Sequence, residues 1–153
     1  TALVAAVGNH GVWNAPTLVD GWTDADGTYH EQEKKVPHEA LRAEVADTLL
    51  LMMESVTDEG GTAGLANVEG YRLAAKTGTA EILGTGGIVP SMAGVIPADD
   101  PQLAMTVVLY NPSVKLTAGE SIAPLFSSVA TDAVRSLGIL PSAENARLFP
   151  TEP

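Results

Sequence analysis

Residues 71–82 have the sequence Tyr-Arg-Leu-Ala-Ala-Lys-Thr-Gly-Thr-Ala-Glu-Ile, which changes midway from apolar to polar. The apolar first half predicts a β-strand with one buried face. Successive side chains of a strand point to opposite faces, so Lys76 and Gly78 are expected on one face and Thr77 and Thr79 on the other. The strand would therefore carry an ammonium group and two hydroxyls within four residues.

The polar residues of this stretch are suited to binding the carboxylate end of a peptide. Gly78 has no side chain, so a ligand can approach the backbone closely. Free N–H groups of an outer strand can pair with an extended peptide, and hydroxyls beside an ammonium group suit a carboxylate. The tripeptide Lys-Thr-Gly is also compatible with a plain edge strand that ends in a turn, so the rest of the sequence has to decide.

The composition predicts one globular domain and excludes several kinds of site. The chain has 153 residues, of which 45% are hydrophobic and 18% charged, enough for one buried core. A net charge of −11 argues against binding to nucleic acid or to an anionic membrane surface. The absence of cysteine excludes disulfides, thiol catalysis and thiolate metal sites. The three histidines lack metal-ligand spacing, and no pattern indicates a cofactor.

The first half of the chain is predicted to contain two helices separated by a hairpin. Residues 1–8 are expected to end a helix, and residues 12–22 to be extended. Residues 24–27 are expected to form the turn of a surface hairpin, followed by a polar segment to residue 35. Residues 38–59 are predicted as the strongest helix. Its expected apolar stripe consists of Leu41, Val45, Leu49, Met52, Met53 and Val56. Its expected solvated face carries Glu39, Glu44, Asp47, Glu54 and Asp58.

The second half is predicted to form three consecutive antiparallel strands and a helix. Residues 91–96 and 103–110 are the further strands, joined by a tight hairpin at residues 98–101. Residues 83–90 are expected to form a mobile loop, and residues 141–153 a loose tail. A helix is predicted over residues 122–137, capped by Ser121 and ended by Gly138, with Pro124 in its first turn. Its expected buried face is Ile122, Leu125, Phe126, Val129, Ala133 and Leu137.

These elements predict an α+β fold in which an antiparallel sheet is packed with helices. The Lys-Thr-Gly strand is expected at an exposed edge of the sheet, and the two long helices are expected to pack on it. No apolar run is long enough to cross a membrane. The chain opens inside a helix-like apolar run, as a piece of a longer protein would, so the lack of targeting signals does not indicate a location.

Several segments in order resemble one family. Residues 76–81, Lys-Thr-Gly-Thr-Ala-Glu, resemble the third active-site motif of penicillin-binding proteins. Residues 2–13, 60–63, 70–71, 93–101 and 123–126 resemble further segments of the class B, monofunctional transpeptidases in the family's order. Ala75 and His10 depart from the family pattern, which often has glycine at both places. The resemblance implies that residues 1–153 are the C-terminal portion of a single transpeptidase domain.

The family's nucleophile is not found in this chain. The family uses Ser-x-x-Lys, with a nucleophilic serine and an activating lysine, and then Ser-x-Asn. None of the eight serines has lysine three residues later or asparagine two residues later; they are Ser55, Ser91, Ser113, Ser121, Ser127, Ser128, Ser136 and Ser142. Both motifs are therefore expected in a segment before Thr1, and this chain alone is expected to be inactive.

The resemblance assigns roles to the four residues of the third motif. Lys76 would supply positive potential and bond the serine of the second motif. The hydroxyls of Thr77 and Thr79 would bind the terminal carboxylate, and Gly78 would let the acyl chain lie against the strand. The backbone N–H of Thr79 would form half of the oxyanion hole. Lys76 and Thr79 are thus the candidate catalytic residues, and Thr77, Gly78 and Thr79 the candidate substrate-binding residues.

The implied reaction is D,D-transpeptidation in peptidoglycan cross-linking. The implied partners are stem peptides ending in D-alanyl-D-alanine, β-lactam antibiotics, the missing N-terminal part of the domain, and proteins of cell-wall synthesis or division. The location would be extracytoplasmic, with the parent anchored to the cytoplasmic membrane by an N-terminal helix. Two alternatives remain open from the sequence: a non-catalytic β-lactam sensor or wall-peptide binding module, and a D,D-carboxypeptidase or β-lactamase with water as acceptor.

Overall fold

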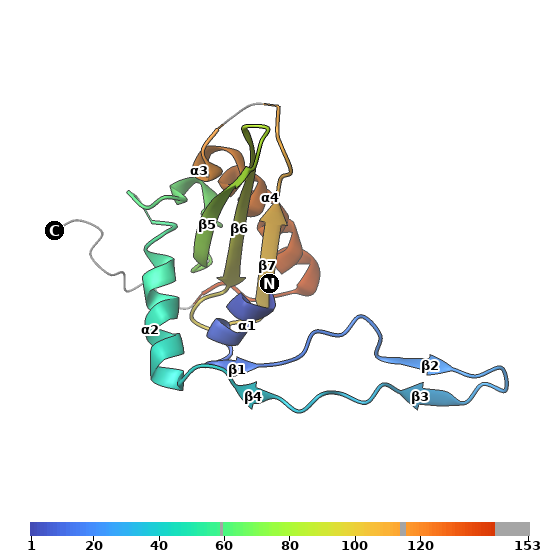
Figure 1. Cartoon of the computed structure of the whole chain (residues 1–153). Helices are drawn as coiled ribbons and strands as arrows, with labels where there is room; N and C mark the ends of the chain where they lie inside the picture. The colour runs from blue at the N-terminus through green and yellow to red at the C-terminus, as the bar shows by residue number, and fades with distance from the viewer. Residues whose placement is uncertain (59, 114–115, 143–153) are drawn as a thin grey trace.

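The computed structural model describes residues 1–58, 60–113 and 116–142, and it has an α+β fold (Figure 1). The elements in chain order are α1 (Ala2–Gly8), β1 (Val12–Trp13), β2 (Gly21–Thr23), β3 (Tyr29–Glu31), β4 (His38–Glu39), α2 (Ala43–Glu54), the 3-10 turn η1 (Gly64–Ala66), β5 (Ala74–Ile82), β6 (Gly87–Ile96), β7 (Leu103–Val108), α3 (Ala118–Ser121) and α4 (Ala123–Leu137).

The predicted sheet is confirmed. Strands β5, β6 and β7 pair antiparallel in that order, so β5 has β6 on one side only and is an edge strand (Figure 1). The predicted hairpin at residues 98–101 joins β6 to β7. The expectation of a mobile loop over residues 83–90 is wrong, because β6 begins at Gly87 and Pro90 pairs with Thr79. Only residues 83–86 form the connection, and positive φ angles at Gly84 and Gly86 make that turn tight.

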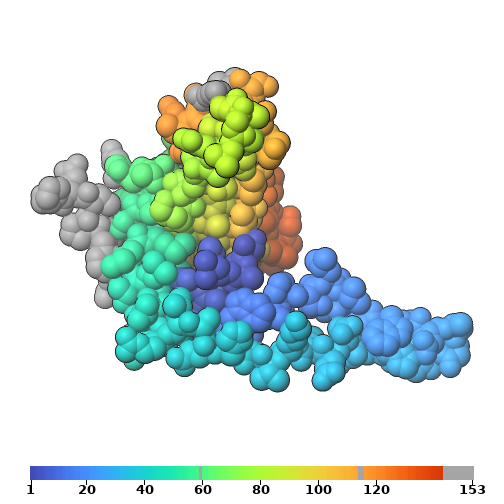
Figure 2. Space-filling model, in the orientation of Figure 1, coloured from blue at the N-terminus to red at the C-terminus, as the bar shows by residue number. Residues whose placement is uncertain are grey.

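The predicted surface hairpin projects from the body of the molecule as an arm (Figures 1 and 2). It consists of β2 and β3, which pair over three residues each, and its base is held by the pairing of β1 with β4. At its tip the Trp22 ring stacks on His30 with centroids 5.3 Å apart, and His30 is 2.6 Å from the carboxylate of Asp24. No helix among the described residues is long and apolar enough to cross a membrane.

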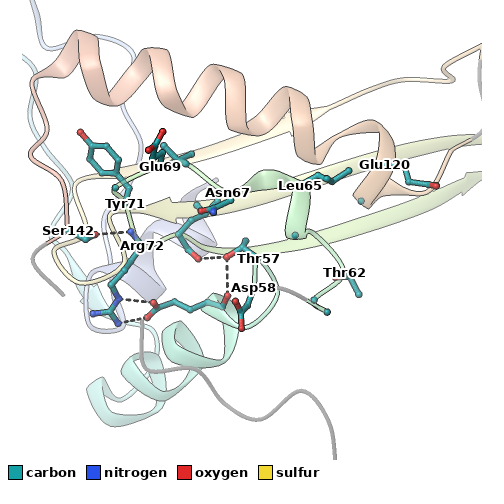
Figure 3. Close-up of a pocket in the computed structure, with 18 of the residues that line it drawn as sticks. Thr57, Asp58, Thr62, Leu65, Asn67, Glu69, Tyr71, Arg72, Glu120 and Ser142 are labelled. Atoms are coloured by element: carbon teal, nitrogen blue, oxygen red, sulfur yellow. Dashed lines mark hydrogen bonds and ion pairs between the residues drawn. The ribbon is translucent and has the colours of Figure 1, made fainter. Parts of the chain in front are cut away.

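A buried ion pair joins the end of α2 to the segment that leads into β5. Arg72 donates from Nε and a terminal nitrogen to the two carboxylate oxygens of Glu54, at 2.8 and 2.7 Å (Figure 3). The Glu54 side chain is 2% exposed, so its predicted place on a solvated face is wrong. The backbone N–H of Arg72 donates to the Ser142 hydroxyl, which donates to Asp99. This network fixes where β5 begins.

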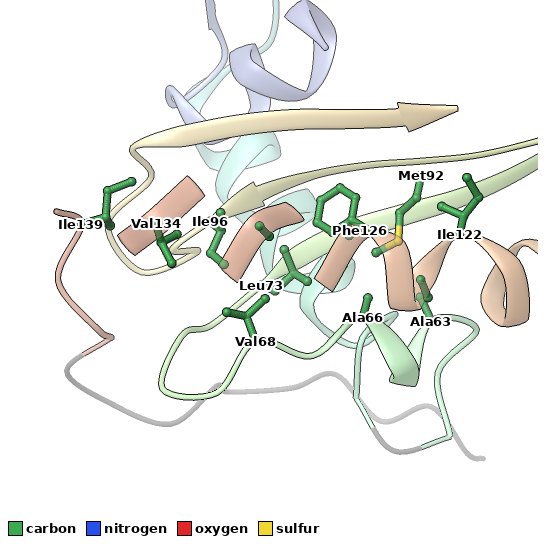
Figure 4. Packing of buried hydrophobic residues seen from close by; sticks show 13 residues of the cluster. Ala63, Ala66, Val68, Leu73, Met92, Ile96, Ile122, Phe126, Val134 and Ile139 are labelled. Carbon is green, nitrogen blue, oxygen red and sulfur yellow. The ribbon is translucent and has the colours of Figure 1, made fainter. Parts of the chain in front are cut away.

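Helix α4 covers one face of the sheet and α1 with α2 covers the other. On the first face the largest fully buried side chain is Phe126 of α4, which packs in one cluster with Met92 and Ala75 (Figure 4). On the second face Ala74 packs with Val7 of α1, Met53 of α2 and Ala98. Consecutive residues of β5 thus enter opposite cores, as the alternation of a strand requires. The predicted packing of both long helices on the sheet is confirmed.

Helix α2 is shorter than predicted. It spans Ala43–Glu54 rather than residues 38–59, because His38 and Glu39 pair with β1 as a strand. Its buried residues are Ala46, Met53 and Glu54, with Leu50 partly buried. Val45, Leu49 and Met52 of the predicted stripe are 41%, 37% and 49% exposed. Leu41, Met53 and Val56 of the predicted stripe do pack in or against the buried clusters, so the stripe is confirmed in part.

Helix α4 turns a face to the core that differs in part from the predicted one. Its buried residues are Ala123, Phe126, Ala130 and Val134. Ile122 and Phe126 of the predicted face are buried as expected, whereas Leu125, Val129 and Leu137 of that face are exposed. The two alanines let the helix approach the sheet closely, and the larger leucines of the predicted face could not do so. The turn of η1 packs on the same helix.

The ends of α4 follow the prediction in part. Pro124 lies in the first turn, and Gly138 ends the helix with φ of 67°. Ser121 does not cap α4, since the residue before the helix is Ile122 and the Ser121 hydroxyl donates to the Thr117 carbonyl. The predicted loose tail falls mainly on residues outside the described part, although Ser142 is hydrogen-bonded to Gly70 and Arg72.

Breaking the buried ion pair is expected to be more costly than breaking an exposed one. Glu54→Gln leaves the Arg72 charge without its carboxylate and should lower the free energy of unfolding by about 3–5 kcal/mol. Urea unfolding measures this. The matched control is Glu31→Gln, because Glu31 and Lys34 are 3.7 Å apart with side chains 70% and 66% exposed. That variant should change stability by about 0–1 kcal/mol. Equal effects of the two variants would contradict a structural role of the buried pair.

Candidate functional site

The four predicted site residues lie together on the exposed edge strand. Lys76, Gly78 and Thr79 are exposed and Thr77 is half-buried, directly after the buried start of β5. Thr77 is paired with Met92, which belongs to the α4 cluster, so Thr77 lies on the α4 side of the sheet. The alternation then places Lys76 on the opposite side, which is that of α1 and α2.

The backbone groups of Thr79 point away from the sheet. The Pro90 carbonyl accepts a hydrogen bond from the Leu109 N–H at 3.0 Å, so Pro90 turns its polar group toward β7. In an antiparallel pair the N–H and C=O of one residue share a side. Because Thr79 is the partner of Pro90, this pair forms no hydrogen bonds between β5 and β6. The N–H and C=O of Thr79 are left facing outward.

The same alternation applies along β5, and a second contact supports it. The Arg72 carbonyl accepts from Ala98 N–H within the sheet, whereas the Leu73 carbonyl accepts from the Thr57 hydroxyl at the outer edge. The backbone N–H and C=O groups of odd-numbered residues in this segment therefore point away from β6. Thr77 is one of these residues. Thr57 covers the edge at Leu73, so the open part of the edge begins beyond that residue. A peptide could pair with the strand there.

Lys76 lies beside this open backbone. Its ammonium donates to the Thr77 carbonyl at 2.6 Å, which holds the positive charge at the outer edge. Among the described residues no carboxylate lies within ion-pair distance of Lys76. Gly78 is opposite Ser91, and a Cβ at Gly78 would lie 3.0 Å from the Ser91 hydroxyl oxygen. The Lys76 ammonium, the Thr77 hydroxyl and the outward backbone groups of Thr77 and Thr79 are thus available to one anionic ligand.

Thr62 is a further polar residue at this site that sequence reasoning did not single out. Its hydroxyl oxygen lies 3.2 Å from the Thr77 hydroxyl oxygen, although 14 residues separate them along the chain. The only signal for it was the place of residues 60–63 in the family resemblance. The contact depends on how the loop after α2 folds back on β5, and no spacing pattern in the sequence encodes that.

A large open hollow lies next to the site rather than at it (Figure 3). It has a volume of about 1330 Å³ and none of residues 76–79 lines it. Thr62, Glu69, Arg72 and Glu120 are among its lining residues. Among the described residues no group of three His, Asp or Glu side chains could hold a metal ion.

Comparison with known proteins settles the family. A sequence model of the penicillin-binding protein transpeptidase domain matches residues 1–131. This chain belongs to the penicillin-binding protein transpeptidase family. The resemblance seen in the motifs is thereby confirmed.

Relatives of this transpeptidase-family chain include two bacterial proteins at 32% identity. One is the peptidoglycan D,D-transpeptidase FtsI of Escherichia coli, matched over 91% of this chain and 23% of the relative. The other is the stage V sporulation protein D of Bacillus subtilis, matched over 92% of this chain and 23% of the relative. The chain therefore spans somewhat less than a quarter of the length of these relatives.

Solved structures share the transpeptidase fold described above. A peptidoglycan synthetase from Bifidobacterium adolescentis superposes with a TM-score of 0.85 at 27% identity, covering 98% of this chain and 28% of that one. Penicillin-binding protein 3 from Mycobacterium tuberculosis, in complex with aztreonam, gives a TM-score of 0.81 at 26% identity, covering 98% and 37%. The fold prediction is confirmed over nearly the whole chain.

The capping box of α3 gives a pH-dependent prediction for this transpeptidase-family chain. The Thr117 hydroxyl and N–H both donate to the Glu120 carboxylate, which lowers the pKa of that carboxyl below its usual range. The folded pKa is depressed, so this contribution to stability is present above the ordinary pKa and is lost as the pH falls through the folded value. Thr117→Ala removes the hydroxyl bond but keeps the backbone N–H, so it should raise the pKa of Glu120 toward its usual range.

An NMR titration of the Glu120 carboxyl carbon measures this change directly. Asp26, in the turn between β2 and β3 of the arm, is a suitable control, because a separate hydrogen bond from Thr28 lowers its pKa and Thr117→Ala leaves that bond in place. A Glu120 pKa that is the same in the wild type and in Thr117→Ala would contradict the capping interaction.

Proposed function

We propose that this chain carries the substrate-binding strand of a peptidoglycan D,D-transpeptidase. The observation that supports it most strongly is the outward-facing backbone of Thr79 on an open edge, beside the Lys76 ammonium and the Thr77 hydroxyl. An extended peptide that ends in a carboxylate matches these groups, because its backbone can pair with the edge and its charge can meet the ammonium. Membership of the family is consistent with this substrate class.

We further propose that residues 1–153 are the C-terminal portion of one transpeptidase domain. The nucleophilic serine would lie in a segment that precedes Thr1. Two facts support this: the chain spans 23% of the length of its FtsI relative, and none of its serines stands in a Ser-x-x-Lys pattern. The parent protein would act outside the cytoplasm, anchored to the cytoplasmic membrane by a preceding helix.

The proposed reaction is acyl transfer through a covalent intermediate. The serine oxygen attacks the penultimate carbonyl carbon of one stem peptide, the amide C–N bond breaks, and terminal D-alanine leaves with a proton on its nitrogen. An amine of a second stem peptide then attacks the ester carbon, and the serine oxygen leaves and regains a proton. A β-lactam would follow the first step, with its ring C–N bond in place of the peptide bond.

This chain would contribute binding and charge stabilisation to that reaction. The Thr79 N–H would donate to the carbonyl oxygen as it gains negative charge, and the hydroxyls of Thr77 and Thr79 would bind the carboxylate of the ligand. Lys76 would supply positive potential and bond the serine of the second motif. Gly78 would let the ligand backbone approach the strand closely, because it has no side chain. No step assigned to these residues requires a cofactor.

The proposed partners of the parent follow from the same site. They are stem peptides ending in D-alanyl-D-alanine, β-lactams, the preceding part of the domain, and proteins of wall synthesis or cell division. The relatives named above include a peptidoglycan D,D-transpeptidase, which favours transpeptidation over a β-lactam sensor, a carboxypeptidase or a β-lactamase. Incubating the parent with a donor peptide in the presence and absence of an acceptor amine distinguishes these activities by their products.

The chain of 153 residues is expected to remain unmodified by penicillin. It contains no serine with the lysine that would activate it. Intact-mass measurement after incubation with excess benzylpenicillin should therefore show only the mass of the free chain, while the parent protein gains one adduct. An adduct in stoichiometric amount on any serine of this chain would refute the proposed location of the nucleophile.

Two substitutions of Thr79 in the parent separate its side chain from its backbone. Thr79→Ala removes the hydroxyl and should weaken carboxylate binding by about 1.5–3 kcal/mol. Thr79→Pro removes the N–H and should slow acylation by about 10²–10³-fold. Because that N–H faces outward, proline there breaks no hydrogen bond to β6, and edge strands tolerate such a proline.

The measurement is the second-order acylation rate with benzylpenicillin, and thermal melting is the control for folding. The matched control is Glu81→Pro, since Glu81 pairs with Ile88 and also faces outward but lies two residues farther from Lys76. A folded Thr79→Pro variant that is acylated as fast as the wild type would mean that β5 does not face the reacting carbonyl.

A further inference from the structure

The loop after α2 brings a second threonine hydroxyl to the side chain of Thr77. The hydroxyl oxygens of Thr62 and Thr77 are 3.2 Å apart, within hydrogen-bond distance, and either one can donate. The Thr77 hydroxyl is also one of the groups proposed above to bind the ligand carboxylate. Thr62 thus contacts a group that is proposed to bind the ligand.

The position of Thr62 is held from both sides of the loop. The N–H of Ala63 donates to the Val56 carbonyl at 2.8 Å, and the N–H of Gly61 donates to the Asp58 carbonyl at 2.9 Å. On the other side α3 packs closely, because a Cβ on Gly119 would lie 2.3 Å from the Thr62 carbonyl oxygen. Only glycine allows that approach. The hydroxyl of Thr62 is therefore presented to Thr77 by a backbone with little freedom to shift.

A carboxylate places a specific demand on the Thr77 hydroxyl. An ionised carboxylate only accepts hydrogen bonds, and a hydroxyl has one proton to donate. Thr77 can serve the ligand only if its proton points toward the ligand rather than into the protein. A neighbouring hydroxyl that donates to the Thr77 oxygen leaves that proton free and, through the chain of hydrogen bonds, strengthens the outer one.

We propose that Thr62 is a positioning residue for carboxylate recognition, which donates to the Thr77 hydroxyl and so directs the Thr77 proton toward the ligand carboxylate. This inference rests on the proposed function and adds a residue that sets specificity for an anionic ligand end. Thr62 acts through Thr77 rather than by touching the reacting atoms. Its contribution should therefore depend on the negative charge of the ligand.

The test compares benzylpenicillin with its methyl ester, which keeps the β-lactam ring but lacks the carboxylate. In the parent protein, Thr62→Val should lower the second-order acylation rate with the acid by about three- to tenfold, as expected for one hydrogen bond. With the ester, the acylation rates of wild type and Thr62→Val should agree within about twofold, because the ester has no carboxylate for the Thr77 hydroxyl to bind. Thr62→Ser keeps a hydroxyl and should restore most of the rate with the acid.

Control variants separate this effect from a change in folding. Thr48→Val makes the same side-chain change on α2, where the hydroxyl donates to the Glu44 carbonyl within the helix, and should leave both rates unchanged. Thr77→Val should lower the rate with the acid on its own. Adding Thr62→Val to it should cost little more, because the two residues act as one unit. Melting temperatures of all variants confirm that each is folded.

The possible outcomes distinguish the inference from the function on which it rests. If Thr77→Val lowers the acylation rate with the acid but Thr62→Val does not, the inference is overturned and the proposed function stands. Equal losses of Thr62→Val with acid and ester would also overturn it, because the residue would then act on the strand as a whole. If neither variant changes the rate with the acid, the assignment of the carboxylate site to β5 fails, and the inference fails with it.

Discussion

The pairing of Thr79 with Pro90 determines what this molecule can offer to a ligand. The Pro90 carbonyl accepts from the N–H of Leu109, just after β7, so the polar backbone side of Pro90 faces away from β5 and nothing on β6 engages the backbone of Thr79. The N–H of Thr79 is left pointing outward from an edge strand, next to the ammonium of Lys76. An unpaired edge is normally a liability that proteins cover or shorten. Here the end near Leu73 is covered by Thr57, and the part with the polar side chains is left open.

The rest of the structure serves to hold that edge strand in place. A buried ion pair between Glu54 and Arg72 fixes its start, and consecutive alanines at 74 and 75 let helices approach it from both faces. Burying two charges is costly unless their partners are well placed, and the paired contacts at 2.7 and 2.8 Å meet that condition. On the α4 side, Gly119 lets α3 press the loop of Thr62 against Thr77. These contacts leave the strand little freedom to shift.

Membership of the penicillin-binding protein transpeptidase family gives this geometry a chemical context. A D,D-transpeptidase needs a nucleophile, a donor set for the developing oxyanion, and a grip on a terminal carboxylate. The residues of β5 suit the second and third needs, and the chain has no serine pattern that suits the first. The division of labour proposed here follows from that contrast.

The sequence by itself determined the elements and the polar residues of the strand. Period-two alternation and the Lys-Thr-Gly-Thr run predicted an edge strand with the correct alternation of faces, and the turns at residues 24–27 and 98–101 were predicted from their turn-forming residues, because these signals are local. The buried faces of α2 and α4, the ion pair of Glu54 and the contact of Thr62 were decided only by tertiary structure. An apolar stripe shows that a helix has a face to bury, but the packing of neighbouring elements determines which side chains are buried. In α4 two alanines are buried and both leucines are exposed. The sequence pattern placed Glu54 on a solvated face, because its partner Arg72 lies 18 residues away in the sequence. The contact between the Thr62 and Thr77 hydroxyls likewise forms only in the folded chain.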